Sequence, residues 1–175
     1  MTRSRIRIPP VASCFIIEDG TLTKFESKDY IKEVYVPDCV KRIGCRVFYE
    51  APVGKVVIPD GVTAIEADAF LDCGLREIEI PDSVTTIETW AFSGCEALRE
   101  ITIPESVTSI GSWAIGYRED QFRPWLDPIP FGHPVIIYGK KDSELSLTVY
   151  SIQEAYPMLK FCYGYFIFKT SKKIY

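Results

Sequence analysis

Ile80-Pro81-Asp82-Ser83-Val84 is one of four near-identical phrases in the chain. The others are Val36-Pro37-Asp38-Cys39-Val40, Ile58-Pro59-Asp60-Gly61-Val62 and Ile103-Pro104-Glu105-Ser106-Val107. Their prolines are 22, 22 and 23 residues apart, and the residues that follow each proline stay in register. An isoleucine follows each valine by three residues, and a large apolar residue comes five residues later: Phe48, Phe70, Phe92 and Ile115. A period of this length is typical of solenoids, in which one unit cannot bury its apolar face alone.

Each copy is predicted to form a strand, a turn, a second short strand and a helical turn. In residues 99–103 the alternation places Ile101 and Ile103 on one face of a strand. The proline that follows cannot donate to a sheet ladder, so it ends the strand. Val84 and Ile87 are then expected to point inward. Residues 90–95, which contain Gly94, are predicted to form one helical turn that closes on that glycine.

The chain is predicted to be one domain, residues 1–175, folded as a right-handed coil of about five rungs, mainly β with short helical turns. Residues 1–30 form an N-terminal cap, because Asp19-Gly20 between alternating residues is a strong hairpin signal. Residues 31–115 are the regular repeats, and residues 116–134 are an insertion loop with eleven more residues than the equivalent return of the preceding repeat. Residues 135–175 supply the last rung and a C-terminal cap, with a short helix over residues 151–160 and a closing strand over residues 161–168.

Composition and charge exclude several classes of partner. The net charge is −4, whereas a nucleic-acid-binding surface needs a basic face. No apolar run approaches the roughly 20 residues that cross a bilayer. Residues 11–17 imitate a signal peptide, but Pro9 and Pro10 precede them and Glu18-Asp19 follows, so we interpret them as mature protein. This interpretation favours a cytoplasmic location.

No motif of an enzyme, a cofactor site or a metal site is present: there is no Gly-rich phosphate loop, G-x-S-x-G or H-E-x-x-H. The single histidine, His133, has no second imidazole with which to hold a metal. The six cysteines contain no CxxC. Cys73 and Cys95 are one period apart, which permits a redox pair or metal ladder but favours a column of small, buried, reduced thiols.

Carboxylates on one predicted strand open a further possibility. Glu77 and Glu79 face the same side, with Glu33 and Glu100 in neighbouring rungs. Paired carboxylates can hydrolyse glycosides. An open sheet face, however, offers no desolvated pocket that separates their pKa values, so a solvated face is the favoured interpretation.

Three groups of residues are candidates for binding. The first is the open strand face: Tyr35, Val57, Glu79 and Thr102. The second is Trp90 and Trp113, which share a repeat position with Arg46 and Asp68; because this position varies in chemistry, we expect it to be exposed, unless the insertion folds over the tryptophans. The third is the insertion loop with Phe122, Arg123, Trp125 and Phe131, which are residue types enriched in binding hot spots. The loop can instead be a structural patch over the fourth rung.

These residues resemble the BspA-like leucine-rich repeats, a bacterial class with a consensus close to L-x-x-I-x-I-P-x-x-V-x-x-I-G-x-x-A-F-x-x-C. Residues 75–95 follow the consensus, residues 15–25 resemble the family's entry cap, and residues 137–143 resemble its exit. The resemblance covers about residues 15–160. Ile115 and Arg118 depart from it, because they replace the Phe and Cys of the fourth rung.

The resemblance implies a non-enzymatic protein, commonly surface-exposed or secreted, that acts in adhesion or host contact. We therefore expect an interaction module that binds a protein partner, without a cofactor, nucleic acid or membrane span. The alternative is a secreted or surface adhesin-like binder of a host matrix protein or a carbohydrate. The location stays open between the cytoplasm and the cell exterior.

Overall fold

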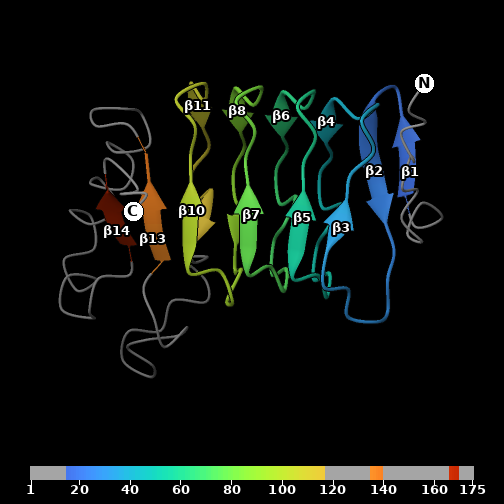
Figure 1. Ribbon diagram of the computed structural model, residues 1–175, viewed down its shortest axis with the longest axis horizontal. Helices are drawn as coiled ribbons and strands as arrows, with labels where there is room; N and C mark the ends of the chain where they lie inside the picture. The colour runs from blue at the N-terminus through green and yellow to red at the C-terminus, as the bar shows by residue number, and fades with distance from the viewer. Residues whose placement is uncertain (1–14, 117–134, 140–165, 170–175) are drawn as a thin grey trace, which may run out of the picture.

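The computed structural model describes residues 15–116, 135–139 and 166–169, which form a parallel β-solenoid (Figure 1). The chain enters through an antiparallel hairpin of β1 (Phe15–Glu18) and β2 (Thr21–Phe25). Asp19 and Gly20 form its turn with φ of 48° and 75°, the left-handed conformations of a type I′ turn. The predicted hairpin cap is confirmed over these residues.

The first strands of successive turns form one sheet of six strands in the order β14-β13-β10-β7-β5-β3. Its members are β3 (Val34–Tyr35), β5 (Lys55–Val57), β7 (Glu77–Glu79), β10 (Glu100–Thr102), β13 (Val135–Tyr138) and β14 (Phe166–Lys169). Four turns begin at β3, β5, β7 and β10, and β13 adds a fifth strand, in agreement with about five rungs. The closing strand is present as β14; residues 161–165 and the helix predicted over residues 151–160 lie outside the described residues.

The short strands build the second and third sides. The second sheet has the order β1-β2-β4-β6-β8-β11. Its repeat members are β4 (Arg42–Ile43), β6 (Ala64–Ile65), β8 (Thr86–Ile87) and β11 (Ser109–Ile110). The third sheet pairs β9 (Phe92–Ser93) with β12 (Ile115–Gly116). Ile43, Ile65, Ile87 and Ile110 are direct partners in successive strands, so the predicted register is confirmed.

The core is a set of columns, each filled by one repeat position. The most continuous is aromatic: the ring centroids of Phe25 and Phe48 are 4.9 Å apart, those of Phe48 and Phe70 5.0 Å, and those of Phe70 and Phe92 5.1 Å. The last two pairs are stacked within 7° of parallel. These separations are close to the spacing of hydrogen-bonded strands, about 4.8 Å. One ring per turn therefore fills the centre of the solenoid without a gap.

The prediction of a helical turn over residues 90–95 is wrong. Within the described residues there is no helix, and Phe92–Ser93 is strand β9. The amide of Ser93 donates to the carbonyl of Trp90 at 3.1 Å, and a hydrogen bond between residues three apart is also found in a tight helical turn. Trp90 and Gly94, however, have φ of 58° and 71°, and left-handed residues on both sides prevent a helix.

The same backbone conformation recurs in every turn. Arg46, Asp68, Trp90 and Trp113 have φ between 56° and 58°. A second left-handed position comes four residues after the first in each of the first three turns, at Glu50 (φ 52°), Asp72 (φ 55°) and Gly94. Only glycine adopts this conformation without steric cost. The fold thus imposes it on side chains as unsuited as tryptophan.

Side chains of one turn complete the hydrogen bonds of the turn before it. The carboxylate of Glu66 accepts from the amide of Cys45 at 3.1 Å, and that of Glu88 accepts from the amide of Ala67 at 3.0 Å. Glu66 also pairs with Arg42, with 2.7 Å between Oε1 and Nε. At the equivalent position of the first turn, Gly44 leaves no room for a side chain, because a Cβ there would collide with the carbonyl oxygen of Leu22. Adjacent turns are therefore joined by polar side chains as well as by strand pairing.

Replacing Ile87 with Asp tests the register. Ile87 is 1% exposed, and burying a carboxylate without a partner costs several kcal/mol, so Ile87→Asp should unfold the chain. The measurement is thermal unfolding followed by circular dichroism. Thr85→Asp, at an exposed position of the same turn, is the matched control and should stay folded. An unchanged melting curve for Ile87→Asp would show that the register is wrong.

Replacing Glu50 with Gly tests the strain in the turns. Glu50 is exposed at φ 52°, and Gly94 occupies the equivalent position of a later turn. Relief of the left-handed conformation should exceed the entropy that glycine adds to the unfolded chain, so Glu50→Gly should raise the free energy of unfolding by about 0.5–1 kcal/mol. Glu96→Gly, outside the positive-φ positions, should lower it. Urea unfolding measures both, and a loss of stability in Glu50→Gly would contradict the argument.

Candidate interaction surface

The predicted strand-face residues form one register column. Tyr35 is the direct partner of Val57, Val57 of Glu79, and Glu79 of Thr102. β13 extends the column, because Thr102 pairs with Tyr138. Tyr35 is 47% exposed, Glu79 and Thr102 are exposed, and Val57 is half-buried. The four residues therefore lie in a row across the outward face of the six-stranded sheet, hereafter the open strand face.

A second outward column carries charge. Lys55 lies between two acidic neighbours, with its Nζ 2.5 Å from Glu77 and 3.9 Å from Glu33. The hydrogen bond to Glu77 is the main reason that the pKa of Lys55 is raised. Glu77 and Glu79 are both exposed, so the paired carboxylates belong to a solvated face, as favoured from the sequence. Within the described residues, Glu79 has neither an ion-pair partner nor a side-chain hydrogen bond.

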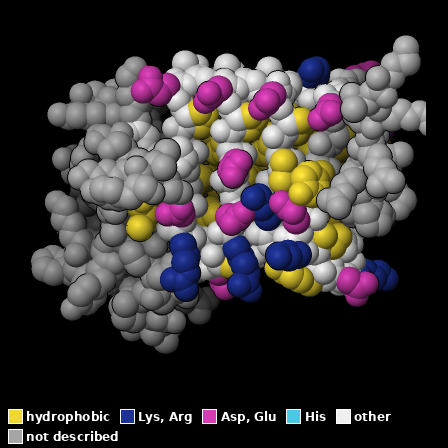
Figure 2. Space-filling model, in the orientation of Figure 1, with side chains coloured by type: hydrophobic (Ala, Val, Ile, Leu, Met, Phe, Trp, Pro, Cys, Tyr) yellow, Lys and Arg dark blue, Asp and Glu magenta, His cyan; other side chains and the backbone are white. Residues whose placement is uncertain are grey.

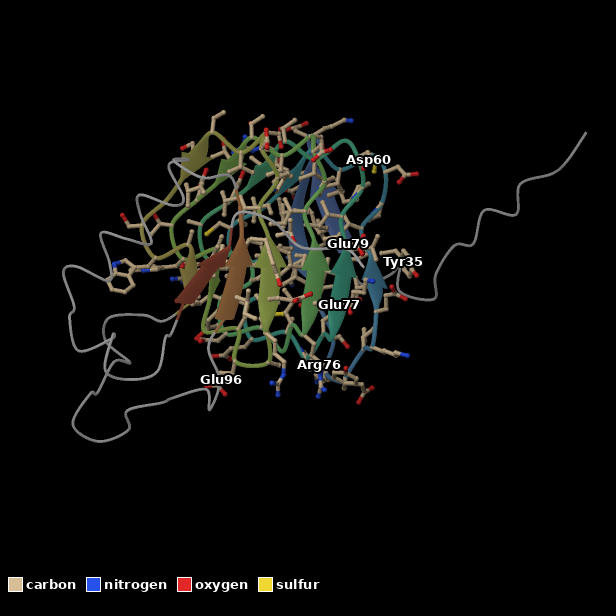
Figure 3. All side chains as sticks on the ribbon, turned by 60° about the vertical axis from the view of Figure 1, so that its left-hand side comes forward. Tyr35, Asp60, Arg76, Glu77, Glu79 and Glu96 are labelled. Atoms are coloured by element: carbon tan, nitrogen blue, oxygen red, sulfur yellow. The ribbon has the colours of Figure 1, made fainter. Side chains whose placement is uncertain are left out.

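The open strand face is bipolar, a property that the sequence interpretation missed. Acidic side chains follow the strands at one end and basic side chains precede them at the other, as the two edges of this face in Figure 2 show. Figure 3 places Asp60 at the first end, Arg76 at the second, and Glu77 and Glu79 between them. The acidic row comprises Asp38, Asp60, Asp82 and Glu105, and the basic row comprises Lys32, Arg76 and Arg99. The signal was present in the repeat: the acidic residues directly follow the prolines, and the basic residues lie five positions before them.

The prediction that the column of Arg46, Asp68, Trp90 and Trp113 is exposed throughout is wrong at Asp68. Asp68 is 6% exposed, and its Oδ2 pairs with Nε of Arg46 at 3.0 Å, so the guanidinium of the preceding turn covers the carboxylate. The other oxygen, Oδ1, is buried without a hydrogen-bond partner among the described residues. Trp90 is 37% exposed and Trp113 is half-buried. The expected exposure is therefore met at Trp90 and only partly at Trp113.

Cys73 and Cys95 are buried free thiols in successive turns. The Sγ of Cys73 donates to the carbonyl of Ala51 at 3.4 Å, and that of Cys95 to the carbonyl of Phe70 at 3.1 Å. Burial raises the pKa of Cys73 to about 12 and raises that of Cys95 as well. Both thiols are thus protonated at neutral pH. This arrangement agrees with the favoured interpretation of small buried residues.

Several candidates lie outside the described residues: the loop residues Phe122, Arg123, Trp125 and Phe131, and His133. In the part of the chain that is described, no cluster of three or more His, Cys, Asp or Glu side chains has the arrangement of a metal site. Nor does a helix with the length and apolarity needed to cross a membrane occur in that part.

Comparison with known proteins identifies the repeat. A family model described as the BspA type leucine rich repeat region matches residues 22–119 in six copies. The chain belongs to this family. Among curated proteins, none matches the sequence significantly.

Three bacterial proteins of known structure resemble the chain. A leucine-rich cell surface protein from Faecalibacterium prausnitzii is 25% identical with a TM-score of 0.56, over 71% of this chain and 31% of that protein. A leucine-rich repeat protein from Bacteroides capillosus is 28% identical with a TM-score of 0.51, over 59% of this chain and 92% of that one. The pneumococcal vaccine antigen PcpA shares the fold, at 18% identity and a TM-score of 0.58, over 90% of this chain and 46% of PcpA. The chain thus spans less than half the length of two of these three proteins.

Thiol labelling of the folded BspA-type chain tests the assignment of the cysteines. Exposed Cys39 and Cys45 should react with iodoacetamide at neutral pH, whereas Cys73 and Cys95 should react only after unfolding, because their raised pKa keeps them protonated and burial blocks access. Peptide mass spectrometry assigns the label to each residue. Replacing Cys73 and Cys95 together with Ala should cost about 2 kcal/mol through lost packing. Rapid labelling of either buried thiol in the native protein would contradict this account.

Proposed function

We propose that the chain is a non-enzymatic interaction module that binds a protein partner on its open strand face. The observation that carries the proposal is the column of Tyr35, Val57, Glu79 and Thr102, which stands in register with its side chains accessible. Packing explains the inward residues of each turn. It does not explain why the outward residues change from aromatic to apolar, acidic and polar along one column. Aromatic, apolar and charged groups in one accessible row provide the mixed chemistry of a protein interface.

Membership of the leucine-rich-repeat family supports the same function, because these repeats generally present a surface and carry out no reaction. The two groups that the sequence offered for other chemistry do not support it. The thiols of Cys73 and Cys95 are protonated and buried, and the carboxylates of Glu77 and Glu79 are solvated. The insertion loop with Phe122, Arg123, Trp125 and Phe131, and the pair Trp90 and Trp113, stay in the proposal as additional contact sites.

A second candidate is an adhesin-like binder of a host matrix protein or a carbohydrate, outside the cell. The observation in its favour is the similarity to the Faecalibacterium prausnitzii protein, which is described as a cell surface protein. Binding to a glycan array, with no protein captured by the open strand face, would favour a carbohydrate ligand over a protein partner.

Site-specific crosslinking tests the proposed face. A photo-reactive benzoylphenylalanine is placed at Val57 or Thr102 in the full chain. The matched controls carry it at exposed Thr63 or Thr108, which directly precede β6 and β11 of the second sheet. In extracts of the native host, the two face positions should crosslink the same protein and the controls should not. A crosslinker at Trp125 examines the loop in the same experiment. Equal crosslinking from face and control positions, or none from the face, would reject the open strand face as the binding surface.

A further inference from the structure

We propose that the open strand face receives a helical segment of a protein partner that lies along the solenoid axis, with basic side chains on one flank and acidic side chains on the other. This inference rests on the proposed function and adds the chemistry and orientation of the partner. It starts from the two rows at the ends of the strands: the acidic row (Asp38, Asp60, Asp82 and Glu105) and the basic row (Lys32, Arg76 and Arg99).

The two rows are built by the repeat. Each acidic residue directly follows the proline that ends a strand, so one carboxylate recurs in every turn. Each basic residue lies five positions before that proline, directly before β7 and β10 and two residues before β3. In the second turn this position is Gly54, where a Cβ would collide with the hydroxyl of Tyr30. The side chains of Arg76 and Arg99 form no ion pair with any described residue. Among the described residues, Asp38, Asp60 and Asp82 of the acidic row likewise form no ion pair, so these charges of both rows are available to a partner.

The spacing of the rows selects the shape of the partner. Arg76 and Asp82 are six residues apart along an extended strand, which separates the two rows by roughly 20 Å. A helix with its side chains is about 10–12 Å across, so it fits between the rows and leaves a few ångströms on each flank for lysine or glutamate side chains to span. An extended segment is narrower and reaches only one row.

The spacing along the solenoid axis agrees with a helix as well. Charges in one row recur about every 4.8 Å, the distance between neighbouring strands. Residues three apart on a helix rise by about 4.5 Å and residues four apart by about 6 Å. Residues on the same side of an extended segment are about 6.7 Å apart, so after the first contact their charges no longer lie opposite the charges of successive turns. A stripe at every third or fourth helical position therefore meets successive turns.

The centre of the face argues for this partner over a second copy of the chain. Glu33, Glu77 and Glu79 surround one compensating cation, Lys55, which pairs with the first two and leaves Glu79 without an ion pair. In a dimer of two such faces related by a two-fold axis, the acidic row of each copy can face the basic row of the other. The central carboxylates of one copy, however, then lie against those of the other. A helix with charges only on its flanks brings no second set of carboxylates to the centre and so avoids this repulsion. Its apolar residues have Tyr35 and Val57 to pack against, at one end of the face.

The probe is a synthetic helical peptide of about 15 residues, enough to span the rows, with lysines on one flank, glutamates on the other and leucines between. The control peptide has the same composition in scrambled order. Fluorescence anisotropy measures binding to the full chain at low salt. The striped peptide should bind more tightly than the scrambled one, and its affinity should fall as ionic strength rises from about 50 to 300 mM because salt screens exposed charges.

Protein variants identify the rows. Asp60→Asn with Asp82→Asn, and separately Arg76→Gln with Arg99→Gln, should each weaken striped-peptide binding roughly five- to tenfold, as the loss of two exposed charge pairs predicts. Glu18→Gln with Glu50→Gln removes two charges from other surfaces and should change binding by less than roughly twofold. Equal binding of the two peptides, or equal effects of row and control variants, overturns the inference. So does a dimer of the chain alone that dissociates when a row is neutralised.

Comparison with the crosslinking experiment separates the two proposals. If Thr102 captures a protein partner but the striped peptide binds no better than the scrambled one, the function stands and the partner chemistry is wrong. If the peptide also displaces the captured partner, both proposals hold. If neither a crosslink nor selective peptide binding is found, the open strand face is not a protein-binding surface and both fail.

Discussion

The match between two distances governs this molecule: the spacing of hydrogen-bonded strands and the spacing of stacked side chains. The rings of Phe48, Phe70 and Phe92 lie 5.0 and 5.1 Å apart, close to the separation of about 4.8 Å that strand pairing imposes. The same step from one turn to the next therefore gives both the hydrogen bonds between strands and the contact between stacked side chains. A turn that shifted its register by one residue would lose both at once. Every other feature, including the regular charge rows, follows from this shared step.

Much of the fold is predictable from sequence because inward residues are constrained by that step. The spacing of Pro37, Pro59 and Pro81 fixes where strands end, and the partners of Ile87 follow from counting alone. The hairpin at Asp19-Gly20 is predictable for a local reason, since these two residues favour left-handed backbone. In both cases residue preference and fold agree.

The missed features are those in which the fold overrides residue preference. Nothing in the sequence of Trp90 or Trp113 suggests a left-handed conformation, which tryptophan adopts at a steric cost, so residues 90–95 looked like a helical turn. The burial of Asp68 depends on its contact with Arg46 of the preceding turn, 22 residues earlier. When each repeat position is considered alone, Arg and Asp in one column indicate only that the position varies in chemistry. The bipolar face was missed for a related reason. Its rows are contiguous across turns, whereas the sequence interpretation followed one strand at a time.

The polar links between turns have a consequence for how the protein can change length. Glu66 and Glu88 each complete an amide of the turn before, and Arg42 also lies 4.0 Å from Glu88 two turns on, so these links join a turn to its near neighbours in the coil. Insertion or deletion of a whole unit leaves every remaining ladder intact, whereas a change by part of a unit breaks two junctions. Lineages that carry this gene can therefore gain or lose binding area in increments of one turn, by unequal recombination between repeats, while the outward residues diverge independently.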